Sequence, residues 1–150
     1  MSKIRIGNIA CAAISLILMI CMFTPFWTVP ETGETASIGD FVGFPGEQKA
    51  LAAYLEAETG EGYNINRVVI GPVAIMALGA VGIALCLLKS GNAFCALIPA
   101  AAGCVGAWGY ISQTALRLGS GWAMHLALCA LLVAAAAFTI FCGVKELKGN

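Results

Sequence analysis

Four long apolar runs constrain the fold of this chain more than any other feature. They cover residues 6–27, 68–88, 93–113 and 123–143, and none of them contains Asp, Glu, Lys or Arg. A helix of about 20 residues crosses the roughly 30 Å hydrocarbon core of a bilayer. The chain is 60% hydrophobic and 11% charged, whereas soluble domains carry roughly 25% charged residues. We therefore predict an all-α membrane protein, a single domain built as a bundle of four transmembrane helices.

The first run has a rival interpretation as a secretory signal peptide. Signal peptides have an apolar region of about 7–15 residues and end at a small-residue cleavage site. The run 6–27 is longer and ends in the bulky sequence FTPFW. We therefore favour a retained span that Pro25 and Pro30 terminate, with Trp27 at the membrane interface.

The segment 28–66 is the one long polar stretch, and it holds seven of the eight carboxylates. Its first part, TVPETGETASI, predicts a short β-hairpin around a Glu-Thr-Gly-Glu turn. The later part, EQKALAAYLEAE, predicts a short helix with Leu51, Tyr54 and Leu55 on one face, ended by Gly60 and Gly62. We expect a structured outer loop that lies over the mouth of the bundle.

The basic residues predict the orientation of the chain. Five lie on the side of the termini (Lys3, Arg5, Lys89, Lys145 and Lys148) and three on the side of the acidic loop (Lys49, Arg67 and Arg117). Because cytoplasmic loops carry the excess of Lys and Arg, we expect a plasma-membrane protein with cytoplasmic termini and an outward acidic loop. Zero formal net charge argues against a nucleic-acid partner. All seven cysteines lie in the apolar runs, which excludes a disulfide framework in the loop.

Small residues recur at helical spacing in the last three runs. Gly79 and Gly82 lie on one side of the second run, and Ala130 and Ala134 belong to a seam in the fourth. In a bilayer such residues let helix backbones approach closely. We predict a tight bundle with further small-residue faces for a second copy or another membrane protein. Pro99 is expected to bend the third span.

Few side chains suggest chemistry. No charged group lies within a span, which argues against a proton- or ion-coupled transporter, and no serine-hydrolase, zinc-protease or phosphate-loop motif occurs. We expect no catalytic residue, cofactor or metal. His125 precedes Cys129 by one turn, so a soft-metal site and a pH-sensitive contact are both alternatives to a plain hydrogen bond. Four polar residues are expected to bond between helices (Asn8, Ser15, Gln113 and Thr139).

The layout resembles the claudin and peripheral-myelin-protein group of four-span proteins. Trp27 beyond the first span, Gly43-Phe44 in the loop and Arg67 at the start of the second span lie near that family's tryptophan, G-L-W segment and arginine. The paired loop cysteines of the family are missing, and Pro45 stands where the family has tryptophan. The resemblance implies four spans, cytoplasmic termini and a large first outer loop with strands and a short helix.

Three function classes remain open. The first is a non-enzymatic membrane protein that self-associates or serves as an accessory subunit, with loop 28–66 as its recognition surface. The second is an oligomeric pore or small-solute channel, and the third is a lipid-handling enzyme or transporter. The candidate interaction residues are Trp27, Phe44, Tyr54, Arg67, Gly79, Gly82, His125, Ala130 and Ala134.

Overall fold

The computed structural model describes residues 2–44, 46–60 and 65–149, without the side chains of residues 65–67 and 69. Its four long helices are α1 (Lys3–Cys21), α4 (Ile65–Leu88), α5 (Leu97–Ser112) and α7 (Trp122–Lys148). Each is long and apolar enough to cross a membrane, α5 together with the 3₁₀ turn that precedes it (Ala93–Ser112). The predicted four-helix membrane bundle is confirmed.

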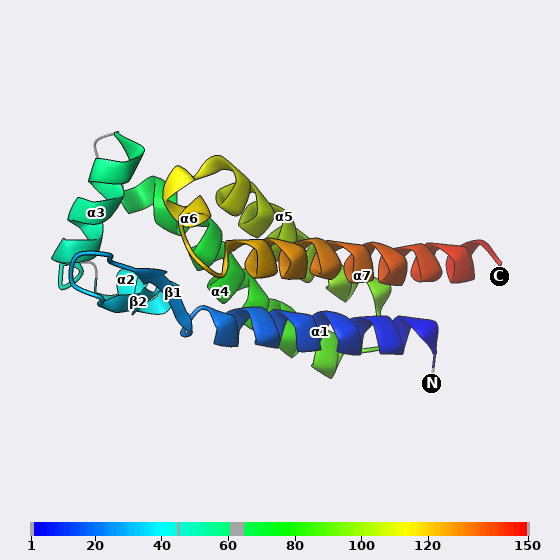
Figure 1. Cartoon of the computed structure of the whole chain (residues 1–150). Coiled ribbons are helices and arrows are strands. Elements are labelled where there is room, and N and C mark those ends of the chain that lie inside the picture. The colour runs from blue at the N-terminus through cyan, green and yellow to red at the C-terminus, as the bar shows by residue number, and fades with distance from the viewer. Residues whose placement is uncertain (1, 45, 61–64, 150) are drawn as a thin grey trace.

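The four helices form a closed ring in cross-section. α1 packs against α4 and α7, and α5 packs against the same two helices from the opposite side (Figure 1). Consecutive helices run antiparallel, so both termini lie at one end of the bundle (Figure 1). The segments between α1 and α4 lie at the other end. We call the end with the termini the basic end, and we call residues 25–44 and 46–60 the cap.

The cap begins with the predicted hairpin. Strands β1 (Pro25–Thr28) and β2 (Thr35–Ser37) pair antiparallel. The turn between them closes through a 2.8 Å hydrogen bond from the Gly33 N–H to the Val29 carbonyl. Gly33 has φ +70°, a conformation that glycine adopts without the Cβ clash of other residues. The hairpin therefore depends on the glycine of the Glu-Thr-Gly-Glu sequence.

Two helices complete the cap, α2 (Ile38–Gly43) and α3 (Lys49–Thr59). The predicted inward face of α3 is confirmed, since Leu51 and Leu55 are buried and Tyr54 is half-buried. Gly60 ends the helix with φ +65°, as a left-handed C-cap requires. Gly62, the second predicted terminator, lies outside the described residues.

A capping box begins α2. The Asp40 carboxylate accepts hydrogen bonds from the Ser37 N–H (3.0 Å) and hydroxyl (2.8 Å), and the Asp40 N–H donates to the Ser37 hydroxyl (3.0 Å). The two donors stabilise the ionised carboxylate and hold the pKa of Asp40 below its ordinary value of 3.8. The two hydrogen bonds that the Asp40 carboxylate accepts are therefore strongest while Asp40 is charged.

The capping box predicts a pH dependence of stability. Because the pKa of Asp40 is lower in the folded chain, its contribution is complete above about pH 4 and is lost as pH falls through the folded value. We expect Asp40→Asn to lower the thermal midpoint at pH 7 by the equivalent of about 1 kcal/mol. The difference from the wild type should shrink as the pH approaches 3. A difference that stays constant over this range would contradict the assignment.

Two expectations, one about a boundary and one about a bend, were wrong. The first span ends at Cys21 rather than at Trp27, because Phe26 and Trp27 belong to β1. Pro99 lies in the first turn of α5, after the 3₁₀ turn η1 (Ala93–Ala96). A proline there loses no helical hydrogen bond and does not bend the span. Pro72, inside α4, is the proline that leaves a helical carbonyl without its usual donor.

Glycines allow α4 and α5 to cross at backbone contact. A Cβ added to Gly109 would lie 2.9 Å from the Gly71 Cα, and one added to Gly71 would lie 3.1 Å from the Gly109 Cα. Gly82 lies against the Pro99 ring, again between α4 and α5. These glycine contacts explain why α4 and α5 pack as tightly as the sequence predicted.

Candidate functional site: the cap and the aromatic cluster beneath it

The chain that leaves α1 folds back onto the bundle. The Trp27 indole N–H donates to the carbonyl of Ala115 in α6 (Thr114–Arg117) at 2.9 Å. The Ser120 N–H donates to the Phe26 carbonyl at 2.8 Å. These two bonds connect the start of the cap to the connection between α5 and α7. The Trp27 side chain is 2% exposed, so it packs within the protein and does not form part of an exposed aromatic belt.

An aromatic cluster lies under the cap. The Phe26 ring lies 4.7 Å from Trp27 and 5.0 Å from His125, measured between ring centroids, and Trp27 lies 5.9 Å from Phe41. Edge-to-face aromatic pairs of this kind stabilise a fold by about 0.5–1.5 kcal/mol beyond their buried area. The cluster joins β1, α2 and α7, so it fixes the position of the cap on the bundle.

His125 and Tyr110 form a buried polar pair within this cluster. The Tyr110 hydroxyl lies 2.8 Å from His125 Nδ1, and both side chains are fully buried. The other ring nitrogen, Nε2, has no partner among the described residues. No group of three His, Cys, Asp or Glu side chains in the described part of the chain is placed to hold a metal ion. The observed role of His125 is a hydrogen bond between α5 and α7.

The surface of the cap carries two shallow grooves between the hairpin and α3, each with a volume of about 370 Å³. Glu34 and Glu47 line the first groove, and Glu31 and Glu58 line the second. Tyr54 lines the second groove as well. Among the described residues, no lysine or arginine lines either groove. Carboxylates thus stand on opposite walls of each groove.

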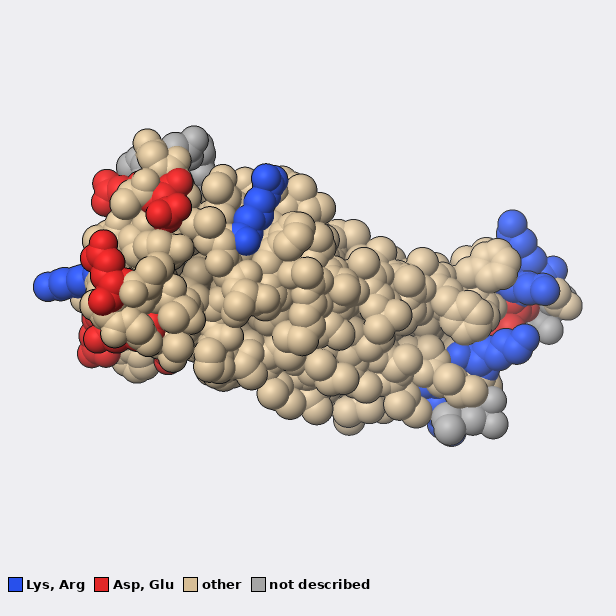
Figure 2. Space-filling view, in the orientation of Figure 1, with Lys and Arg blue, Asp and Glu red and all other residues tan. Residues whose placement is uncertain are grey.

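Figure 2 shows the separation of charge along the molecule. Acidic side chains gather at the cap end, where basic side chains also appear, and most basic side chains gather at the opposite end, with a largely uncharged belt between the two ends. The grooved surface therefore belongs to the acidic end.

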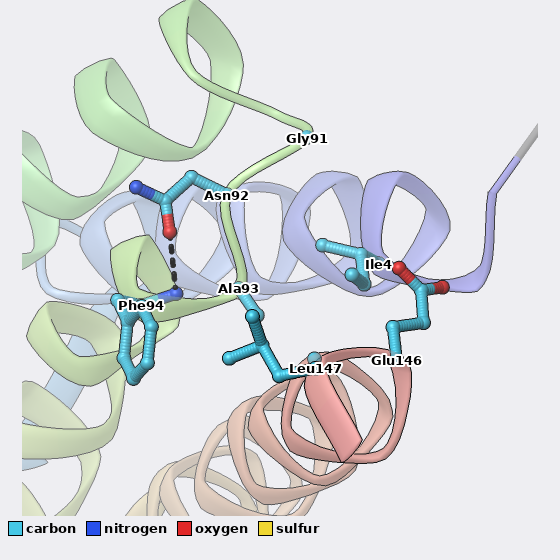
Figure 3. Close-up of a pocket in the computed structure, with 8 residues that line it drawn as sticks. Ile4, Gly91, Asn92, Ala93, Phe94, Glu146 and Leu147 are labelled. Atoms are coloured by element: carbon cyan, nitrogen blue, oxygen red, sulfur yellow. Dashed lines mark hydrogen bonds between the residues drawn. The ribbon is translucent and has the colours of Figure 1, made fainter. Parts of the chain in front are cut away.

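The basic end carries a pocket of about 320 Å³ between the α4–α5 connection and the ends of α1 and α7 (Figure 3). Phe94, Leu147 and Ile4 form its apolar walls, and the Glu146 carboxylate lies toward Ile4 (Figure 3). Asn8 lies buried nearby, and its amide donates to the Ser90 and Asn92 carbonyls at 2.9 Å each. The Asn8 side chain of α1 therefore fixes the α4–α5 connection, which forms one wall of the pocket.

The candidate interaction residues separate into buried and exposed groups. Phe44 is 64% exposed on the cap. Gly79 packs toward Met19 of α1 and Gly82 toward Pro99, so both serve contacts within one bundle. Ala130 and Ala134 lie on the outer surface. The side chain of Arg67 is outside the described part of the chain.

The four polar residues of the spans differ in their hydrogen-bond partners. Asn8 makes the expected contacts between segments. Thr139 instead donates to the Ala135 carbonyl of its own helix, and Gln113 donates to the neighbouring Ser112 hydroxyl. The Ser15 hydroxyl has no partner among the described residues. Asn8 thus bonds to the α4–α5 connection, and Thr139 also has a hydrogen-bond partner on another helix, the Cys11 thiol of α1.

Three residues of the cluster were not anticipated from the sequence as site residues, namely Phe26, Phe41 and Tyr110. Their partners lie far away along the chain, as with Trp27 and Ala115, which are 88 residues apart. The proline-aromatic sequence at the end of the first run was the one sequence signal for this cluster. The same sequence is equally typical of aromatic residues at a membrane interface.

Family models, curated proteins and solved structures were compared with the chain, and none of them matches it. The resemblance to the claudin group stays a prediction from the sequence.

Proposed function

We propose that this is a non-enzymatic integral membrane protein whose bundle presents the cap as a recognition surface, and that the cap binds a basic segment of a membrane-protein partner. The observation that carries the proposal is the pair of grooves with carboxylates on both walls. Complementary charge selects partners and steers their encounter. The orientation that goes with this proposal has cytoplasmic termini and an outward cap in the plasma membrane.

The rigid connection between cap and bundle supports an accessory role. The Trp27–Ala115 hydrogen bond and the aromatic cluster hold the cap in one position relative to the spans. A recognition surface held in this way loses less conformational entropy on binding than a flexible loop does.

Photo-crosslinking in native membranes tests the recognition surface. Phe44 is replaced by a photo-reactive phenylalanine, because its side chain is exposed and its carbonyl accepts a hydrogen bond from the N–H of the groove residue Glu47. We expect one discrete adduct with another protein. Its yield should fall roughly fivefold in Glu34→Lys, because the variant loses a carboxylate that attracts the basic partner and gains an ammonium group that repels it. Glu56→Lys makes the same charge change on α3 outside the grooves and should alter the yield less than about twofold. The proposal is abandoned if the two variants behave alike or if no discrete adduct forms.

Self-association is a second candidate, and the outer surface of α7 favours it. Ala127, Ala130, Ala134 and Ala137 are all exposed and follow the three-four spacing of one helix face. Small residues allow a second helix to approach closely in a bilayer. The seam predicted in the fourth span thus lies outside the bundle rather than within it.

Ala130→Leu tests this second candidate. A leucine at the centre of the α7 face should weaken self-association by about 1–3 kcal/mol through overpacking. Native mass spectrometry of the gently solubilised protein should then show a smaller oligomer. Ala13→Leu places the same side chain on the exposed surface of α1 and should leave the mass unchanged. An Ala130→Leu protein with unaltered mass would exclude this face as the interface.

The interior of a single bundle offers no support for the pore and enzyme alternatives. Leu18, Leu132 and Ala136 are fully buried and fill the space between the helices. A pore between copies and a lipid-handling activity stay predictions from the sequence, and liposome flux assays test the first of them.

A further inference from the structure

A groove of about 520 Å³ lies at the basic end between the start of α1 and the last turns of α7. Ser2 and Lys3 of α1 form one wall. Phe138, Phe141 and Lys145 of α7 form the other. The groove is thus apolar along α7 and basic at its end.

The spacing of the α7 residues explains this division. Phe138, Phe141, Cys142 and Lys145 follow the i, i+3, i+4, i+7 pattern, so they share one face of the helix. Phe138 is 53% exposed and Phe141 is 66% exposed on the surface of the bundle. Since α7 crosses the membrane, this part of the face lies at the depth of acyl chains. Lys145, two turns beyond Phe138, lies toward the headgroups.

Two lysines line this groove, and their ammonium groups have no partner within the described part of the chain. Neither Lys3 nor Lys145 makes an ion pair or a side-chain hydrogen bond within the described part of the chain. Glu146 also lines the groove, so its formal charge is +1 from two lysines and one carboxylate. The remaining basic residues of this end, Arg5, Lys89 and Lys148, add to the positive potential around it.

We propose that this groove binds one phospholipid with an anionic headgroup. The headgroup phosphate lies between Lys3 and Lys145, and an acyl chain lies along Phe141 and Phe138. Basic pockets at the headgroup level of helix bundles attract anionic lipids by the same combination of charge and apolar contact. The neighbouring pocket of Figure 3 is a poorer site for such a lipid, since its lining includes Glu146 and no basic residue.

Native mass spectrometry of the full chain with added phosphatidylglycerol or phosphatidylcholine tests the proposal. Each lysine near a membrane surface contributes about fivefold to anionic lipid binding. We expect Lys3→Gln/Lys145→Gln to lower the preference for phosphatidylglycerol roughly 25-fold. The control Lys89→Gln/Lys148→Gln removes two charges from the same end outside the groove and should lower the preference less than about threefold.

A gain-of-binding variant separates loss of the site from loss of the fold. Glu146→Gln removes the one carboxylate of the groove and should raise the preference about fivefold. Equal losses in the two double variants would overturn the proposal in favour of diffuse surface charge. It would also be overturned by an unchanged preference in Glu146→Gln, or by inorganic phosphate that displaces the lipid at equal concentration.

Discussion

Gly109→Ala is expected to destabilise the bundle by about 1–3 kcal/mol, although the change adds only one methyl group. The new Cβ would lie 2.9 Å from the Gly71 Cα, and a backbone atom cannot move away as a side chain can. The helices α4 and α5 would have to separate, and the contacts around the crossing would loosen. Thermal unfolding in detergent, followed by the exposure of buried cysteines, measures the effect.

Gly79→Ala provides the matched control. Its Cβ would lie 3.5 Å from the Met19 sulfur, an ordinary contact with a flexible side chain. Because alanine favours helix over glycine by about 1 kcal/mol, this variant should be as stable as the wild type or more stable. If Gly109→Ala and Gly79→Ala change the thermal midpoint equally, the close approach of the α4 and α5 backbones does not limit how tightly these helices pack.

Trp27→Ala is the second change with a large expected effect, about 3–5 kcal/mol of unfolding free energy. It removes the buried side chain that packs on Phe41 and leaves the Ala115 carbonyl without its indole donor. The cap should detach from the bundle before the spans separate. Limited proteolysis should therefore cut the cap at protease concentrations that leave the wild type intact.

Two further variants serve as controls for Trp27→Ala. Trp27→Phe keeps most of the apolar volume and loses the hydrogen bond, so about 1–3 kcal/mol is expected. Trp108→Ala removes an exposed tryptophan from α5 and should leave proteolysis of the cap unchanged. A cap that resists protease equally in Trp27→Ala and in the wild type would refute the anchoring role of Trp27.

The four spans, the hairpin and the cap helix could be predicted from the sequence because each depends on local patterns. Uncharged runs of about 20 residues specify the spans. The Glu-Thr-Gly-Glu turn and the Leu51, Tyr54 and Leu55 face specify the cap elements. These signals lie within one element and need no knowledge of the partner.

The candidate site was less predictable because its contacts join distant segments. Trp27 ends the first apolar run of the sequence, which is typical of an interfacial residue, and its acceptor at Ala115 leaves no mark in the nearby sequence. Gly79 and Ala130 look alike in the sequence as small residues, yet one lies inside the bundle and the other outside. Helical spacing shows which residues share a face and does not show what that face contacts.

The contacts of Asn8 have a consequence for the order of biogenesis. Its carbonyl acceptors at Ser90 and Asn92 lie 82 and 84 residues further along the chain. At about 5–20 residues per second, a ribosome needs on the order of ten seconds to synthesise that interval. During this time α1 is in the membrane with an amide whose final partners do not yet exist, so water or the translocation machinery must satisfy it. The four-helix bundle can reach its native packing only after the α4–α5 connection has been synthesised.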